Sequence, residues 1–191
     1  MNLHLPNADV TLDSDFLSRE EADSLFATLS RDIDWRQEDV VIQGRRIPQP
    51  RLTAWFGRGY TYSGLTMTPM PWLPSLEALR KRLSEHCGQE FNSVLANRYR
   101  SNRDSIGFHS DNERELGPDP VIASISLGRS RDFILAPKRG REGRRTVVRL
   151  EHGSLLLMGR GTQPNWMHEI EKEGTPSNKE RINLTFRTIN P

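Results

Sequence analysis

The second half of the chain is a succession of short apolar or alternating runs, each separated from the next by turn residues. Runs of this kind are typical of β-strands. They cover residues 91–99, 121–127, 132–136, 146–150, 154–158 and 181–188. Many short strands that follow helices favour an antiparallel double sheet of jelly-roll or barrel type, with the helices against one outer face. We therefore expect an α+β fold that is mainly β.

Two amphipathic helices are expected before the strands. Ser18 and Glu21 form an S-x-x-E capping box, and apolar residues follow at helical spacing. A second helix begins near Pro74, keeps a stripe of leucines, and ends at Gly88. Both helices have the pattern of packing elements.

The 191 residues correspond to one large domain, residues 1–191. Residues 37–72 are rich in Pro, Gly, Arg and aromatic residues, and we expect them to form loops and short strands over the mouth of the barrel. The expected segments are an N-terminal extension with a helix (1–36), this mouth segment (37–72), a supporting helix (73–90) and a jelly-roll core (91–190).

Several classes of protein are disfavoured by the composition. The longest purely apolar run, residues 155–158, is far shorter than the ~20 residues that cross a bilayer. Residues 1–15 carry no Lys or Arg and no apolar stretch of signal-peptide length, and Cys87 is the single cysteine. We expect a monomeric intracellular protein without a membrane partner, cytoplasmic, or nuclear in a eukaryote.

Basic residues are concentrated in one segment, although the net charge is only +2. Between residues 129 and 149, eight Lys and Arg stand against Asp132 and Glu142, a local excess of six positive charges. The segment is interpreted either as solvated loops or as a groove for a phosphate backbone.

Three residues have the composition of a metal site. His109 and Asp111 are two residues apart, so in an extended chain both side chains point to one face. His168 lies 59 residues further on, a separation that adjacent antiparallel strands close. Two His and one carboxylate form the facial triad of non-haem iron(II) oxygenases. The alternative is an H-x-D pair that arose by chance, with His109 in a loop.

The last predicted strand places four polar residues on one face and apolar residues on the other. The polar face consists of Arg181, Asn183, Thr185 and Arg187. It is either the solvated face of an edge strand or a site where arginines bind a dianion. Asn97 and Tyr99 share a strand face and can donate hydrogen bonds to the same ligand. A metal triad with paired arginines suggests 2-oxoglutarate, a dicarboxylate that also chelates iron.

Seven motifs follow one another along the chain: PRLTAW (50–55), YTYSGLT (60–66), NRY (97–99), HSDNE (109–113), IASISLG (122–128), HGSLL (152–156) and RINLTFR (181–187). Together they resemble the AlkB family of iron(II)/2-oxoglutarate nucleic-acid dealkylases, in the branch of the human DNA-repair homologues. The resemblance covers about residues 37–190. It implies a double-stranded β-helix (jelly roll) with two supporting helices in the N-terminal half, and it makes residues 37–72 a nucleotide-recognition lid.

The resemblance also implies a function. The protein would demethylate N-alkylated bases of DNA or RNA, such as 1-methyladenine and 3-methylcytosine, and release formaldehyde, succinate and CO2. This is direct-reversal repair with Fe(II) as cofactor and 2-oxoglutarate and O2 as cosubstrates. The alternatives are an oxygenase of the same type that acts on a protein or small molecule, and a non-catalytic binder of modified nucleic acid.

By the same resemblance, His109, Asp111 and His168 would be the catalytic iron ligands. Arg181, Asn97 and Tyr99 would hold the distal carboxylate of 2-oxoglutarate, and Arg187 and Asn183 the carboxylate next to the keto group. The predicted substrate contacts are Arg51, Tyr60, Tyr62, Asn112, Glu113, Ile42 and Gln43.

Stacking of a flipped base between His109 and Tyr62 is implied as well. The chain departs from the family's pattern in two respects. Asn112 stands where close relatives have Asp, which leaves the preferred base open. Ile42 and Gln43 stand where a duplex-specialised relative has an aromatic wedge, which leaves the strand form open.

Overall fold

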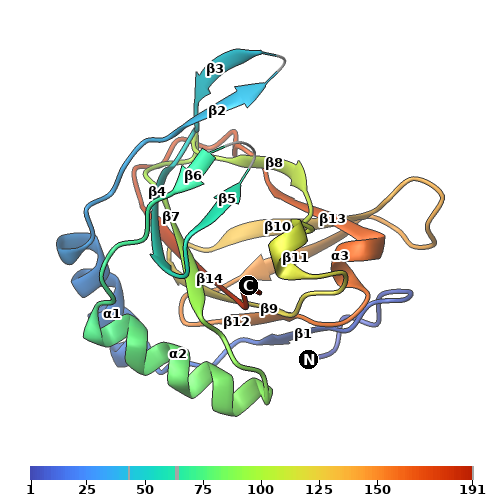
Figure 1. Ribbon diagram of the computed structural model, residues 1–191, viewed down its shortest axis with the longest axis horizontal. Helices are drawn as coiled ribbons and strands as arrows, with labels where there is room; N and C mark the ends of the chain where they lie inside the picture. Colours follow the sequence, from blue (N-terminus) through green and yellow to red (C-terminus); the bar gives the residue numbers. More distant parts are fainter. Residues whose placement is uncertain (43, 63–64, 191) are drawn as a thin grey trace.

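Two antiparallel sheets face each other in the computed structural model, which describes residues 1–42, 44–62 and 65–190 (Figure 1). The six-stranded sheet has the order β1 (Val10–Asp13), β12 (Leu155–Met158), β9 (Ile122–Gly128), β14 (Arg181–Arg187), β7 (Ser93–Tyr99) and β4 (Leu52–Gly57). The four-stranded sheet has the order β11 (Thr146–Leu150), β10 (Arg131–Pro137), β13 (Trp166–Ile170) and β8 (Ile106–His109). The expectation of a mainly β, antiparallel double sheet is confirmed.

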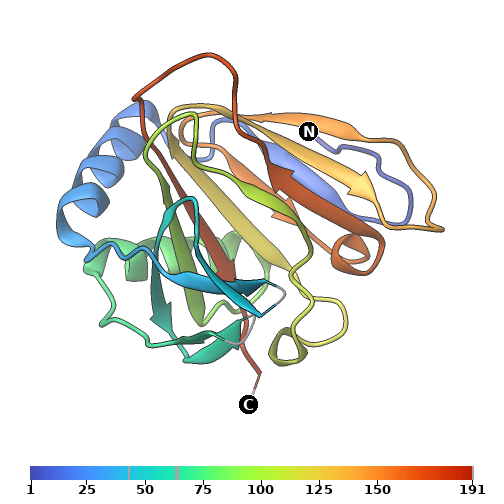
Figure 2. The same ribbon diagram turned by 90° about the horizontal axis from the view of Figure 1, so that it is seen from above.

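The two long helices cover the outer face of the six-stranded sheet (Figure 2). Helix α1 (Arg19–Asp32) begins at the Ser18 and Glu21 capping box, as predicted. Helix α2 (Pro74–Cys87) ends at Gly88, whose φ of 59° is a left-handed conformation that glycine adopts without strain. A four-residue helix, α3 (Thr162–Asn165), and a 3-10 turn, Arg114–Leu116, complete the described helical segments. None of the helices in the described ranges is long and apolar enough to cross a membrane.

The apolar side chains form two main clusters. The larger lies between α1, α2 and the six-stranded sheet and includes Leu29, Leu83 and Phe186, each 0% exposed. The second lies between the two sheets and includes Phe133 and Trp166. Because this second cluster fills only part of the space between the sheets, a cavity lined by both polar and apolar side chains remains beside it.

The boundaries of the segments differ from the sequence-based expectation at two strands. β1 lies within the N-terminal extension and β4 within residues 37–72, yet both form edges of the six-stranded sheet. The rest of the mouth segment contains two separate hairpins, β2 (Asp39–Ile42) with β3 (Arg45–Pro48), and β5 (Tyr60–Tyr62) with β6 (Leu65–Met67). β2 and β3 stand away from the body of the molecule (Figure 1).

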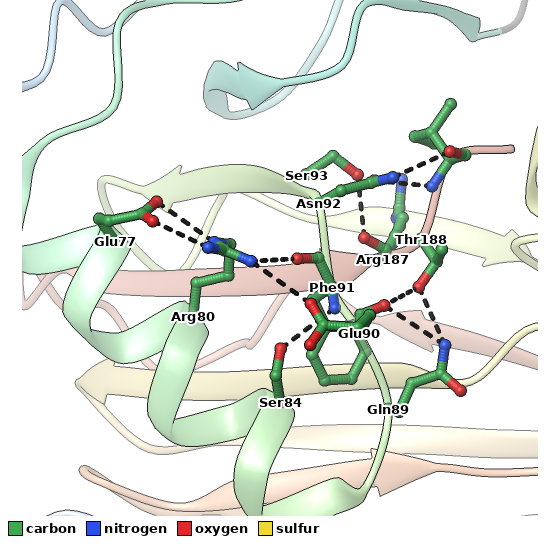
Figure 3. A network of polar contacts seen from close by, with 11 residues as sticks. Glu77, Arg80, Ser84, Gln89, Glu90, Phe91, Asn92, Ser93, Arg187 and Thr188 are labelled. Atoms are coloured by element: carbon green, nitrogen blue, oxygen red, sulfur yellow. Dashed lines mark hydrogen bonds and ion pairs between the residues drawn. The ribbon is translucent and has the colours of Figure 1, made fainter. Parts of the chain in front are cut away.

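A network of polar contacts ties the end of β14 to helix α2 (Figure 3). Arg80 of α2 donates from Nη1 to the carbonyl of Phe91 at 2.7 Å. The next residue, Asn92, exchanges two hydrogen bonds with the backbone of Ile189, at 2.9 and 2.8 Å, and donates its N–H to the carbonyl of Arg187. The C-terminal end of β14, which carries Arg187, is therefore fixed to the helical layer.

Candidate metal and cosubstrate site

The three predicted metal ligands meet between the sheets. β8 and β13 are neighbours, and His109 stands opposite His168 in their register. One ligand atom each from His109, Asp111 and His168 can be chosen so that all three lie within 4.8 Å of one another. The two imidazole rings have centroids 4.3 Å apart. The donor set of two imidazoles and one carboxylate fits Fe(II).

Asp111 does not lie on an extended strand with His109, as their spacing predicts. β8 ends at His109, so Asp111 lies in the segment after the strand. Its backbone N–H donates to Oε1 of Gln163 at 2.9 Å, and Nη2 of Arg187 donates to its Oδ1 at 2.8 Å. Gln163, which is 1% exposed and belongs to α3, is a residue that no sequence signal indicated.

The ligands are already in the protonation states that a metal needs. His109 Nδ1 lies 2.9 Å from the carbonyl of Gly107, which can only accept, so Nδ1 carries the proton and Nε2 is free to ligate. Burial lowers the pKa of His109, and burial together with the nearby His109 lowers the pKa of His168 to about 3. Burial opposes ionisation of Asp111, but Arg187 and the two histidines hold its pKa below the ordinary value. Metal binding therefore requires little proton release.

The polar face of β14 lines the same cavity as the metal ligands. β14 lies in the middle of its sheet, between β9 and β7, so the alternative of a solvated edge strand is excluded. The predicted cosubstrate residues that line the cavity are Asn97, Tyr99, Arg181, Asn183 and Arg187. The structure therefore brings the whole predicted cosubstrate set beside the three predicted ligands.

Arg181 is a buried cation whose hydrogen-bonding capacity is mostly unused. It is 2% exposed, its Nη2 donates to Oγ of Ser126 at 3.0 Å, and its guanidinium lies 5.2 Å from the centre of the Tyr99 ring. Nε and Nη1 are buried without a hydrogen-bond partner in the part of the chain that the structure describes. Burial lowers the pKa of Arg181 to about 10. A carboxylate would supply the missing acceptors and the missing charge, so the site fits a dicarboxylate.

Arg51 orients the amide of Asn97. Nε of Arg51 donates to Oδ1 of Asn97 at 2.7 Å, and both side chains are buried. Because Oδ1 accepts this hydrogen bond, Nδ2 of Asn97 is the atom left to donate to a ligand. Arg51 was predicted as a substrate contact, and the structure places it in the wall of the cosubstrate cavity.

Asn183 is more heavily engaged than predicted. Its Nδ2 donates to Oγ of Ser124 at 2.8 Å and to the carbonyl of Ile125 at 3.0 Å, while its Oδ1 accepts from Thr185. A hydrogen bond from Asn183 to a carboxylate would replace one of these contacts. Ser124 and Ser126 are further polar residues of this face that the sequence reasoning did not single out.

The predicted base contacts lie partly outside the described residues. Gln43 lies outside the described residues, as do the side chains of Ile42, Tyr60 and Tyr62. Asn112 is exposed and Glu113 is part-exposed, directly after Asp111. Their roles, and the role of the mouth segment as a lid, stay predictions.

The basic segment, residues 129–149, contains both cations in ion pairs and exposed cations. Arg131 is buried, Arg145 pairs with Glu171 at 2.8 Å, and Arg149 pairs with Asp132 at 2.9 Å. Besides Arg145, the exposed cations of the β10–β11 loop, which projects from the body in Figure 1, are Arg139, Arg141 and Arg144. The loop is thus the part of the segment that can meet a polyanion.

Comparison with known proteins places these observations in a family. The sequence model of one protein family, the 2OG-Fe(II) oxygenase superfamily, matches residues 9–187. The alpha-ketoglutarate-dependent dioxygenase alkB homolog 3 of Rattus norvegicus is 44% identical over 185 residues, which are 92% of this chain and 62% of the relative. The DNA oxidative demethylase ALKBH2 of Mus musculus is 43% identical over 189 residues, which are 91% of this chain and 77% of the relative.

A solved structure, that of OsALKBH1, shares the fold. It has a TM-score of 0.64 at 18% identity and covers 94% of this chain and 97% of its own. The chain spans 62 to 64% of the length of its alkB homolog 3 relatives from rat, cow, mouse and human.

Proposed function

The chain belongs to the 2OG-Fe(II) oxygenase superfamily and, within it, to the AlkB family, and on this premise we propose that it removes alkyl groups oxidatively from nucleic-acid bases. The observation that carries the oxygenase chemistry is one cavity lined both by His109, Asp111 and His168 and by Arg181, whose Nε and Nη1 have no hydrogen-bond partner among the described residues. The similarity to the mouse DNA oxidative demethylase supports the nucleic-acid substrate.

The cofactors supply the oxidation and the chain supplies the geometry. Bound Fe(II), with 2-oxoglutarate and O2, provides the chemistry that hydroxylates an N-methyl group, which then leaves as formaldehyde, with succinate and CO2 as coproducts. His109, Asp111 and His168 would hold the iron. Arg187 keeps Asp111 ionised through its 2.8 Å hydrogen bond, and Gln163 fixes the backbone of that ligand.

The far end of the cavity is built to bind the distal carboxylate of 2-oxoglutarate. Arg181 offers Nε and Nη1, and Asn97 offers the Nδ2 that Arg51 leaves free. Because these groups are buried and positioned before the ligand arrives, little reorganisation is needed on binding. Apolar residues complete the wall and exclude water: Leu95, Ile106, Phe133, Met158 and Ile170.

Selection of a damaged base begins outside this cavity. Alkylation at a Watson–Crick nitrogen weakens base pairing, so extrusion of such a base costs less than extrusion of a normal one. Part-exposed His109 and the mouth segment that carries Tyr62 would receive the base, and the β10–β11 loop would contact phosphates. This proposal covers DNA and RNA alike.

The decisive experiment is mass spectrometry of DNA and RNA oligonucleotides that contain 1-methyladenine or 3-methylcytosine, incubated with the protein, Fe(II) and 2-oxoglutarate. We expect loss of the methyl group with formaldehyde and succinate formed in step, and no reaction with the Asp111→Ala variant. Conversion of 2-oxoglutarate without demethylation of any oligonucleotide would favour a protein or small-molecule substrate. Binding of the oligonucleotides without any succinate would indicate a non-catalytic binder.

A further inference from the structure

Arg131 is a buried arginine that lies between the sheets, behind the wall of the cosubstrate cavity. It is the first residue of β10, its side chain is 1% exposed, and it is not among the described residues that line the cavity. A contact with the cosubstrate is therefore not its role. Its contact with the ring of Tyr99 indicates a role in positioning that residue.

The ring of Tyr99 is held by guanidinium groups from both sheets. Arg181, its register partner on β14, lies 5.2 Å from the ring centre, and Arg131, from the four-stranded sheet, lies 5.8 Å from it. Such contacts between a cation and an aromatic face are attractive, and more so when they are desolvated. The position of Tyr99 therefore depends on Arg131 as well as on its own strand.

Arg131 is itself fixed by two loops. Its Nη1 donates to the carbonyl of Ser101 at 3.4 Å, and its Nη2 donates to the carbonyls of Asp104, at 3.2 Å, and Glu171. Its Nε lies 3.4 Å from Oε2 of Glu173. The planar guanidinium thus has partners on several sides and cannot easily shift.

A buried cation is a costly way to fill this space, because an apolar side chain would require no desolvation of charge. The position of Arg131 suggests what the buried charge contributes in return for its desolvation. Tyr99 and Arg181 line the part of the cavity assigned to the distal carboxylate, so the placement of Tyr99 determines how long a dicarboxylate can be.

We propose that Arg131 is a positioning residue that holds the Tyr99 ring against Arg181 and thereby sets the chain length of the 2-oxo dicarboxylate that the cavity accepts. The inference rests on the proposed function only in taking a 2-oxo dicarboxylate as the ligand.

The test compares the binding of 2-oxoglutarate with that of 2-oxoadipate, which is one methylene longer. Dissociation constants are measured by calorimetry on the Mn(II)-loaded protein, so turnover is not required. In Arg131→Met we expect 2-oxoglutarate to bind about tenfold more weakly and its preference over 2-oxoadipate to fall about tenfold, equivalent to about 1.4 kcal/mol. Arg131→Lys retains the charge without the planar fork and should show the same change to a smaller extent.

Arg98→Met is the matched control. Arg98 precedes Tyr99 on β7 but is directed to the helical layer, where it pairs with Glu180 at 2.7 Å and lies over the ring of Trp35. Its loss should lower the thermal midpoint and change the preference between the two acids by less than about twofold.

A double-mutant cycle separates positioning from general damage. If Arg131 acts through Tyr99, the effect of Arg131→Lys on the preference should disappear in a Tyr99→Leu background, because the interaction is already lost there. Should Arg131→Met not fold, Arg131→Lys with this cycle decides the question.

An unchanged preference in the folded Arg131 variants, or full additivity in the cycle, would overturn the inference. A wild type that does not bind 2-oxoglutarate would contradict this inference and the proposed function together. A wild type that binds it with the expected dependence on Arg131, but demethylates nothing, would contradict the proposed function alone.

Discussion

Asp111 combines two roles in one buried carboxylate, since it is a predicted iron ligand and also the acceptor for Arg187 at 2.8 Å. Arg187 and the two histidines favour its ionised form, and Oε1 of Gln163 accepts a hydrogen bond from its backbone N–H. At the scale of single residues, the site therefore depends on contacts behind the ligands as much as on the ligands.

Replacing Asp111 with Ala should abolish demethylation and leave a folded protein, because it removes the carboxylate of the triad. His109→Ala and His168→Ala should behave alike. Mn(II) binding followed by electron paramagnetic resonance, together with a thermal melt, checks both parts. Near-normal turnover of any of the three variants at saturating iron would refute the metal assignment.

Arg181→Met should weaken the binding of 2-oxoglutarate without lowering the stability of the fold. Loss of one side of a desolvated charge pair typically costs about 2–5 kcal/mol, which corresponds to a rise of about 30-fold or more in the 2-oxoglutarate requirement. Because Nε and Nη1 of Arg181 have no hydrogen-bond partner among the described residues, the variant should be at least as stable as the wild type in the absence of 2-oxoglutarate. Thermal melts with and without 2-oxoglutarate measure both effects. An unchanged 2-oxoglutarate requirement would remove Arg181 from the cosubstrate site.

At the scale of elements, strand pairing assembles the site from distant segments. β8 and β13 bring His109 opposite His168, and β14 carries Arg181 and Arg187 through the middle of the other sheet. The β10–β11 loop returns to this region, because Gly143 lies so close to the Trp166 ring that an added Cβ would be 2.4 Å from it. Gly143 thus holds the loop against the start of β13, and the exposed residues on both sides of it, Arg139, Arg141 and Arg144, form a basic tip.

The basic tip can be tested separately from the paired arginines. Changing Arg139, Arg141 and Arg144 together to Gln should weaken all oligonucleotides about equally, because phosphate contacts carry little sequence information. The slope of log affinity against log salt should flatten by up to about 0.7 per lost contact for single strands and about 0.9 for duplex.

The matched control for the loop is Arg145→Gln with Arg149→Gln. Both arginines already pair with carboxylates, at 2.8 and 2.9 Å, so their replacement should change the salt slope less. If the triple variant retained the wild-type slope, the loop would be ordinary solvated surface.

At the scale of the whole molecule, the buried site makes the stability of the metal-free protein depend on pH. His168 has a folded pKa of about 3, against about 6.5 in an unfolded chain, so between these values the unfolded state binds a proton that the folded state does not. The free energy of unfolding should therefore fall as the pH is lowered from about 6.5 towards 3, by up to about 1.4 kcal/mol per pH unit for this group.

Urea unfolding of the EDTA-treated protein between pH 4 and pH 8, a range chosen to bracket a pKa of about 6.5, measures this dependence. The His168→Gln variant should show a shallower decline on the acid side, because its substituted residue does not titrate. An equal decline in both proteins would assign the pH dependence to other groups. Separately, size-exclusion chromatography of the folded protein without urea checks the predicted monomeric state.

Local patterns in the sequence were sufficient for much of the architecture. The capping box at Ser18 and Glu21, the end of α2 at Gly88 and the alternation along β14 were all readable, because caps and strand periodicity involve residues close together in the chain. β8 and β13 were not recognised as strands, since each is short and lacks clear alternation. The family motifs indicated the predicted iron and cosubstrate residues without those strands.

Only the tertiary structure decided how the site is held. Asp111 is placed by Gln163, 52 residues away, and the amide of Asn97 is oriented by Arg51, 46 residues away. Arg131, one of eight cations in a segment read as a possible nucleic-acid surface, is instead buried between the sheets. No periodicity encodes such contacts, because they arise where strands that are distant in sequence meet in one core, and their chemistry is defined by burial that only the folded chain creates.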